Sequence, residues 1–222
     1  VVAKEGEPYG TFTGREMRRT PDGEIIFGED GLPELTDEFK VQGSYQPDWT
    51  GGIENTFRYR GFRLSTLIDA RIGGEIYSGT NVIGRRAGTL ASTLKGREEG
   101  IVGDGVVENE DGSFSPNTTR VPAIEWYLNY YGYNNTEVSV FDGSYVKLRE
   151  VALSYTLPQR LTQALFARTV TLTALGRNLA ILHKNVPNID PETAISSDVE
   201  QGIEFGQIPS TRSLGFKVSL AF

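Results

Sequence analysis

Apolar residues alternate with small or polar residues along the last stretch of the chain, residues 213–222. The apolar positions, which share one side of an extended chain, are Leu214, Phe216, Val218, Leu220 and Phe222. A period of two is the signature of a β-strand with one face in an apolar medium. A half-buried strand of a soluble sheet and a lipid-facing strand of a transmembrane barrel both have this pattern. Other stretches must therefore decide between these two folds.

Residues 52–77 have the pattern of a long hairpin. Apolar and polar residues alternate up to Tyr59 and again from Phe62, on either side of Arg60-Gly61, a two-residue loop of the kind that closes a tight hairpin. In such a pair Tyr59 and Phe62 lie opposite each other. We expect a second strand of about 15 residues, longer than the usual globular strand and suited to a tilted membrane strand.

The polar side of this second strand carries Arg63, Asp69 and Arg71. A sandwich would leave such a face to bulk water, whereas a barrel would turn it into a wet lumen. The length and the charges of the strand therefore favour a barrel.

Residues 143–158 predict a third strand. Alternate residues from Val151 to Leu157 mark its apolar side, and Pro158 ends it because proline cannot donate to the ladder. Lys147 and Arg149 fall on the apolar side by parity. Either this end of the strand projects above the hydrocarbon, or a bulge switches its faces. We favour the first explanation.

The chain after Pro158 predicts a short helical turn at 161–167 and a further strand at 169–182. Val170, Leu172 and Ala174 mark the apolar side of that strand. Gly176 is a candidate bulge within it.

Three other stretches lack this periodicity. Residues 1–50 are rich in turn formers and predict a small hairpin, 9–13 with 24–27, inside a long loop. Residues 78–143 and 184–209 are predicted to be long loops, which argues against a compact soluble domain. Outer-membrane barrels place long loops outside the cell and short turns in the periplasm, and the same asymmetry is present here.

Composition excludes several classes of protein. No stretch approaches the roughly 18 apolar residues of a membrane-spanning helix, and a net charge of −7 argues against a nucleic-acid partner. The chain has no cysteine and one histidine, His183, so it lacks a thiolate or histidine cluster for a metal or cofactor. Glu98 and Glu99 are adjacent in a loop and no nucleophile motif occurs. The sequence predicts no enzyme. It leaves open a glycosidase-like pair of carboxylates that are far apart in the sequence and close in space.

Several motifs together resemble the SusC/RagA family of TonB-dependent outer-membrane transporters, in the order in which the family has them. They are Pro47-Asp-Trp-Thr-Gly-Gly52, Phe57-Arg-Tyr-Arg-Gly-Phe62, Tyr145 to Pro158, Gly176-Arg-Asn-Leu179, Asp190-Pro-Glu192 and Pro209 to Phe222. The resemblance covers most of the chain from Pro47 onward. Many members also carry a calcium-loop-like segment that this sequence lacks, so no metal site is carried over.

The resemblance implies an all-β fold, in which antiparallel strands form the C-terminal part of a large transmembrane β-barrel with long extracellular loops. Such barrels have about 22 strands around a plug domain. We therefore expect a piece of a longer chain, with the plug domain absent. Residues 1–50 would be an extracellular loop region with a small hairpin, and residues 51–222 the C-terminal barrel strands and loops.

The function implied by the resemblance is energy-coupled import of oligosaccharides or peptides. The expected partners are a SusD-like surface lipoprotein, the TonB complex through the missing N-terminal part, and outer-membrane lipid. Two alternatives stay open: a soluble all-β carbohydrate-binding module, and a passive porin-type barrel without a plug. A soluble module would be stable without detergent.

The family topology places the chain in the bacterial outer membrane, with its C-terminus periplasmic and its long loops extracellular. Counting the strands back from Phe222 then puts the Arg60-Gly61 turn at the periplasmic side. Tyr59, Phe62, Tyr155 and Phe222 are accordingly predicted to form an aromatic belt at the inner membrane boundary.

Two sets of residues are candidates for contact with substrate, because arginine binds carboxylates in a fork and aromatic rings stack on sugars. The lumen set is Arg58, Arg63, Asp69 and Arg71, and the loop set is Trp126, Tyr127, Tyr130, Tyr131 and Tyr133. The alternative for the lumen set is a solvated ladder of charges that contacts a plug. The alternative for the loop set is a small core that holds the long loop together. Lys147 and Arg149 are expected at lipid phosphates of the outer leaflet or in solvent.

Overall fold

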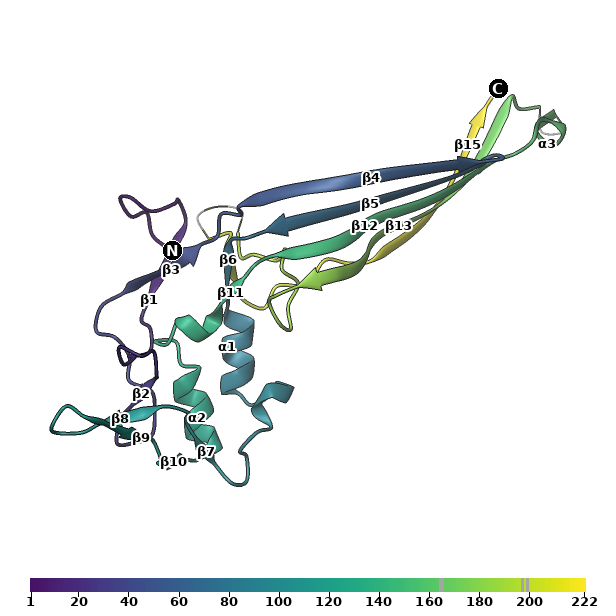
Figure 1. Ribbon diagram of the computed structural model, residues 1–222. Coiled ribbons are helices and arrows are strands. Elements are labelled where there is room, and N and C mark those ends of the chain that lie inside the picture. The colour runs from purple at the N-terminus through teal and green to yellow at the C-terminus, as the bar shows by residue number, and fades with distance from the viewer. Residues whose placement is uncertain (164–165, 197, 199) are drawn as a thin grey trace.

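The computed structural model describes residues 1–163, 166–196, 198 and 200–222, and it consists of a long sheet joined at one end to a loop region (Figure 1). The sheet is antiparallel and has five strands in the order β15-β13-β12-β5-β4. Their bounds are β4 (Trp49–Tyr59), β5 (Phe62–Ile72), β12 (Tyr145–Thr156), β13 (Thr169–Lys184) and β15 (Ser213–Ala221). The predicted antiparallel all-β class is confirmed. Within the described residues the sheet is open, with β4 and β15 at its edges.

Many short strands lie outside the long sheet. The described chain also contains three short α-helices. The strands outside the long sheet are β1 (Thr11–Gly14), β2 (Ile26–Phe27), β3 (Lys40–Ser44), β6 (Glu75–Ser78), β7 (Ile101–Val102), β8 (Val106–Glu108), β9 (Phe114–Pro116), β10 (Arg120–Val121), β11 (Val140–Asp142) and β14 (Ile203–Glu204). The helices are α1 (Gly79–Arg86), α2 (Ala123–Tyr130), α3 (Gln159–Gln163) and the 3₁₀ turns η1 (Ala91–Thr93) and η2 (Glu137–Ser139). No described helix has the length and apolarity needed to cross a membrane.

The stretch 78–143, predicted as a long loop, contains the two helices α1 and α2, which the sequence analysis did not predict. Each is an eight-residue helix, too short for a 3.6-residue period to stand out in the sequence. The side chain of Ser78 caps α1 by accepting a hydrogen bond from the Asn81 backbone N–H. Pro122, which cannot donate a backbone hydrogen bond, directly precedes α2.

The β4–β5 hairpin has the predicted turn. Arg60 and Gly61 have φ values of 43° and 85°, as a tight hairpin loop requires, and Tyr59 lies opposite Phe62. The second strand is shorter than expected: β5 ends at Ile72, because the following Gly73 and Gly74 both adopt positive φ and redirect the chain into β6.

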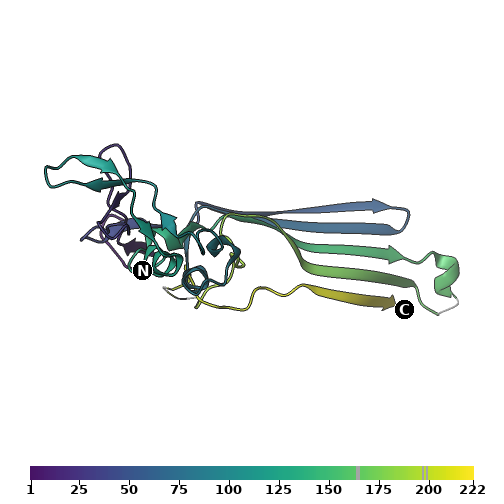
Figure 2. The same ribbon diagram turned by 90° about the horizontal axis from the view of Figure 1, so that it is seen from below.

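The apolar side of the long sheet is not covered by a second layer of the described chain (Figure 2). One cross-strand row on this face consists of Phe57, Leu64, Leu153, Ala174 and Phe216. Phe57 and Phe216 at its two ends are 64% and 69% exposed. A sheet that buried this face in a soluble core would cover such side chains. We call this surface the apolar face and the opposite one the polar face.

A bulge in β12 reverses which residues point to each face. Arg149 has no partner in the ladder with either neighbour, and the register shifts between Leu148 and Glu150 on both sides. Lys147 consequently lies opposite Asp69 on the polar face, and Leu148 opposite Ile68. The bulge, which was not our preferred explanation, therefore accounts for the position of Lys147. Gly176 is not a bulge in β13, since it pairs regularly with Val151; the irregularities lie at Asn178, whose φ is 50°, with Leu179, and at Leu182.

The hairpin predicted within residues 1–50 forms only in part: around the Pro-Asp-Gly turn the predicted arm 24–27 pairs with residues 18–20, through an antiparallel bridge between Arg19 and Ile25, and not with 9–13. A tight turn is present at Pro21 to Gly23, but β1 pairs with β3 and β2 pairs in parallel with β8. Part of the predicted helical turn at 161–167 is α3, and Ala164 and Leu165 lie outside the described residues.

Candidate functional site

Charged side chains gather on the polar face where β12 and β13 meet the loop that follows β13. The Lys147 ammonium donates to Asp190 Oδ1 and to Glu192 Oε2, each at 2.5 Å. The Lys147 side chain is 2% exposed and that of Asp190 is 4% exposed. Buried charges require such pairing, since an isolated charge in a low-dielectric interior is strongly unfavourable. Lys147 thereby fixes the loop to the sheet.

Arg149, the bulge residue, extends the same group of charges. Its guanidinium binds both carboxylate oxygens of Asp69, with Nε–Oδ1 at 3.0 Å and Nη2–Oδ2 at 2.6 Å, and it also contacts Glu192. The Tyr145 hydroxyl donates to Glu192 Oε1 at 2.9 Å. Two-point binding of this kind fixes orientation as well as distance. We call the six residues the charge cluster: Asp69, Tyr145, Lys147, Arg149, Asp190 and Glu192.

The two loop carboxylates of the charge cluster are held ionised. Burial raises the pKa of Asp190, but hydrogen bonds from Lys147 and Ser210 outweigh it and bring that pKa to about 2. Burial likewise raises the pKa of Glu192, and hydrogen bonds from Arg149 and Lys147 lower it to about 2. The cluster contains two cations and three carboxylates, so its charges nearly cancel.

A second polar network joins the same loop to α1. The buried carboxylate of Glu204 accepts hydrogen bonds from Ser78 Oγ and Thr80 Oγ1, at 2.8 and 2.5 Å, beside the helix N-terminus. Asn81 Nδ2 donates to the Pro187 carbonyl at 3.0 Å. A negative charge at this end of a helix is stabilised by the helix dipole. The loop is therefore attached at two points, to the sheet and to the helix.

Between these two attachments lies a cavity of about 600 Å³. Its lining includes Lys147, Asn178 and Lys184 from the sheet and Gln207 and Arg212 from the segment before β15. β13 pairs with β15 only as far as Arg177, so the cavity follows the part of β13 that has left that ladder. The arrangement can admit a small polar ligand or ordered water.

The predicted strand candidates occupy three different environments on the polar face. Arg63 is exposed and lies directly opposite Arg58. Asp69 is bound by Arg149 within the charge cluster. Arg71 donates to the Tyr45 carbonyl and thus holds the start of the loop region.

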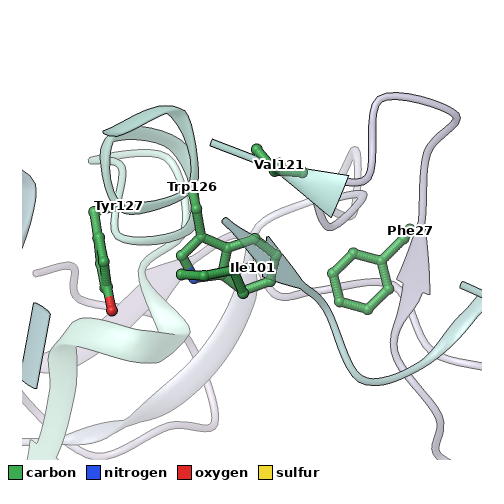
Figure 3. Close-up of a cluster of buried hydrophobic side chains, with 5 residues drawn as sticks. All are labelled: Phe27, Ile101, Val121, Trp126 and Tyr127. Carbon is green, nitrogen blue, oxygen red and sulfur yellow. The ribbon is translucent and has the colours of Figure 1, made fainter. Parts of the chain in front are cut away.

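The predicted loop aromatics lie apart from the strand candidates, on and after α2 in the loop region (Figure 1). Trp126 and Tyr127 are buried with Phe27, Ile101 and Val121 in a hydrophobic cluster (Figure 3). The rings of Trp126 and Tyr130 stack with centroids 4.8 Å apart, and so do those of Tyr127 and Tyr131 at 6.0 Å. A pocket of about 380 Å³ is lined by all four of these rings.

Tyr133 differs from the other loop aromatics because it is 55% exposed. The Arg86 guanidinium covers one face of its ring at 4.3 Å from the centroid. The exposed part of the Tyr133 side chain is accessible to a ligand.

Three of the four predicted belt residues lie in one row on the apolar face. Tyr59 is opposite Phe62 and Phe62 is opposite Tyr155, with the last two ring centroids 4.4 Å apart. Phe222 follows β15, two residues after Leu220, and is 84% exposed. All four lie at the end of the sheet away from the loop region (Figure 1).

The sequence argument did not identify the roles of Lys147, Arg149, Asp190, Glu192 and Glu204. The sequence signal for these roles is that Lys147 and Arg149 fall on the apolar side of the predicted strand. The sequence analysis explains this by contact with lipid phosphates or solvent. That expectation is wrong, because both side chains bind carboxylates of the charge cluster. Within the described residues no group of three or more His, Cys, Asp or Glu side chains is arranged to hold a metal ion.

Comparison with known proteins gives a consistent result. No protein-family model matches the chain. The chain is 27% identical over 250 residues to the "TonB-dependent receptor P3" of Formosa agariphila, an alignment that covers the whole chain and 23% of that relative. The chain thus spans about a quarter of the length of this relative.

Solved structures give the same fold. The structure of the RagAB peptide transporter matches 96% of the chain and 23% of its own chain, with a TM-score of 0.60 and 17% identity. The RagAB peptide importer in its "closed-closed" state matches the whole chain and 25% of its own chain, with a TM-score of 0.58 and 14% identity. At these identities the likeness establishes the fold.

The fold class is therefore that of the wall of a large antiparallel barrel of the TonB-dependent transporter type. Within this class, the chain resembles a segment of the SusC/RagA family, and the resemblance predicted from its motifs is confirmed.

Proposed function

We propose that the chain forms part of the barrel wall of a TonB-dependent importer in a bacterial outer membrane, and that the importer takes up oligosaccharides or peptides. The observation that carries this proposal is the exposed cross-strand row from Phe57 to Phe216, which faces away from a charged polar face. Hydrocarbon is the medium that suits such a face, and a wet lumen suits the other. The role is transport and involves no catalytic residue.

The proposal includes an orientation, with the two ends of the sheet on opposite sides of the membrane. The end with the Arg60-Gly61 turn and Phe222 would be periplasmic, and the loop region extracellular, where a SusD-like lipoprotein would cover it (Figure 2). The TonB complex would act on another part of a longer protein, which would also supply the plug. The chain's 23% coverage of its TonB-dependent relative supports this division.

The substrate-facing residues of the proposal are Arg63, Asp69 and Arg71 on the polar face and the aromatic side chains of the loop region. Among the latter, Tyr133 is the most accessible, and Tyr130 and Tyr131 line the aromatic pocket. Trp126 and Tyr127 contribute by holding these rings in place. Rings presented in this way stack on sugars or on apolar peptide side chains.

The test is an uptake assay in cells that express the intact protein as their only route for labelled oligosaccharides or peptides. We expect uptake of one class of substrate that stops when TonB is removed. Uptake that continues without TonB would support a passive porin-type barrel instead. Recovery of the isolated chain as a monodisperse, detergent-free monomer that binds carbohydrate would support a soluble module.

A further inference from the structure

The connection between β12 and β13 presents apolar and basic side chains at the end of the sheet that carries the Arg60-Gly61 turn. We call this end the turn end. Leu161 and Phe166 are 54% and 91% exposed. Arg160 and Arg168 are exposed beside them, and Arg60 lies on the neighbouring β4–β5 turn. Exposed apolar groups next to cations are the composition of segments that bind at a membrane surface.

The described residues of the connection, up to residue 163 and from residue 166, include buried and hydrogen-bonded positions. Thr162 and Ala167 are buried, and the Ala167 backbone N–H donates to the Thr162 carbonyl at 3.2 Å. The Leu157 N–H donates to the Val170 carbonyl at 2.9 Å. Leu161 and Phe166 are therefore each next to a buried residue, Thr162 and Ala167.

The apolar face is covered at Val170, next to the connection. Val170 shares that face with Leu172, yet Val170 is only 3% exposed while its neighbour Leu220 in β15 is 54% exposed. α3 contacts β13, the strand that begins beside it. The turn is thus continuous with the apolar face and with the aromatic row of Phe62 and Tyr155.

The turn end of the sheet carries positive charge, whereas the whole chain has a negative net charge. Residues 57–63, 156–175 and 214–222 contain no Asp or Glu, although the chain has a net charge of −7. Arg60, Arg160 and Arg168 form no ion pair with any described carboxylate. Unpaired arginines at a membrane boundary attract anionic lipid headgroups.

We propose that the β12–β13 connection is an anchor for anionic phospholipid in the leaflet at the turn end. Leu161 and Phe166 enter the boundary between headgroups and acyl chains, and Arg60, Arg160 and Arg168 bind the phosphates. The proposal rests on the proposed membrane location and adds a lipid preference to it. The occupant is a phospholipid because the apolar side chains adjoin the arginines, which a free phosphate would not require.

The experiment measures binding of fluorescent phosphatidylglycerol and phosphatidylcholine to the intact protein in detergent micelles. We expect the natural protein to prefer phosphatidylglycerol, and Arg160→Gln/Arg168→Gln to lose about fivefold in affinity for each arginine removed. Arg160→Lys/Arg168→Lys keeps the charges and should keep most of the preference. Lys4→Gln/Lys95→Gln removes the same charge from exposed lysines of the loop region and should change nothing.

The apolar part of the anchor has its own matched pair of variants. Phe166→Asp should weaken retention of both lipids, whereas Ile124→Asp, at a 70% exposed position in α2, should not. A protein that inserts into bilayers and transports, but whose lipid preference is the same in Arg160→Gln/Arg168→Gln, overturns the anchor alone. A protein that neither inserts nor transports overturns the proposed function and the anchor with it.

Discussion

The Lys147 ammonium lies 2.5 Å from Asp190 Oδ1, and both side chains are almost inaccessible to solvent. The two residues come from different parts of the structure, β12 in the long sheet and the loop after β13. A buried pair of this kind adds little stability relative to an apolar pair, but it specifies one arrangement, because removing either partner leaves an unpaired buried charge. The position of the loop therefore depends on it.

Removal of Lys147 should destabilise the protein more than removal of any exposed cation. We expect Lys147→Met to lower the free energy of unfolding by about 3 kcal/mol, because Asp190 is left buried without its cation. Asp190→Asn should have a similar effect, and the double variant should cost less than the sum of the two. Thermal unfolding of the detergent-solubilised protein gives these values, and strict additivity would show that the pair is not coupled.

The same carboxylates predict how loop docking depends on pH. The pKa values of Asp190 and Glu192 are lowered to about 2 in the folded state, below their ordinary values near 4. The stability that they contribute is therefore fully present above about pH 4 and is lost as the pH falls toward 2. Midpoints of thermal unfolding between pH 5 and 2 should fall steeply for the natural protein. Asp190→Asn/Glu192→Gln should start lower and change less over that range.

The bulge at Arg149 predicts a difference between two single-residue deletions. Deleting Arg149 removes the extra residue and joins Leu148 to Glu150, so Lys147 stays opposite Asp69 on the polar face. We expect this variant to insert, measured by heat-modifiable mobility of membrane fractions. Deleting Leu148 instead brings Arg149 into register opposite Ile68 on the apolar face, where a charge is costly in lipid, so that variant should fail to insert. Equal insertion by both variants would contradict the assigned role of the bulge.

The sequence predicts features that depend on neighbouring residues, but not those that depend on residues far apart in the chain. The β4–β5 turn follows from residues that are adjacent in the chain, and the prediction of Tyr59 opposite Phe62 is confirmed. The side of the sheet to which residues 145–148 of β12 point could not be predicted in this way. Their reversal is stabilised by Asp190 and Glu192, which are 43 and 45 residues away from Lys147. α1 and α2 were missed because two helical turns give too little periodicity.

The candidate site was predictable only in part, for the same reason. A stretch rich in tyrosine and tryptophan is compatible both with a functional aromatic surface and with a small core. The structure places Trp126 and Tyr127 in a core whose other members, including Phe27 and Ile101, lie far away in the sequence. The substrate role of the exposed aromatics stays a prediction.

Glu204 should control the attachment of the loop to α1. Glu204→Gln replaces one carboxylate oxygen by an N–H₂ group that faces the donors Ser78, Thr80 or the Gly206 N–H. We expect a loss of about 1 to 3 kcal/mol from the unmatched hydrogen bond. Hydrogen exchange should quicken in α1 and in residues 203–206. Glu200→Gln, at an exposed position of the same loop, is the control and should leave exchange unchanged.

Trp126 and Tyr133 separate packing from substrate contact among the loop aromatics. Trp126 is 8% exposed within the hydrophobic cluster, whereas Tyr133 is 55% exposed under Arg86. Trp126→Ala should therefore cost about 3 to 5 kcal/mol of local stability, seen as faster hydrogen exchange in α2. Tyr133→Ala should cost about 0.5 kcal/mol, the worth of an exposed cation–π contact. If Tyr133 binds substrate, Tyr133→Ala lowers uptake at unchanged surface expression and unchanged exchange in α2, while Tyr133→Phe preserves it. Full uptake by Tyr133→Ala would confine these aromatics to a structural role.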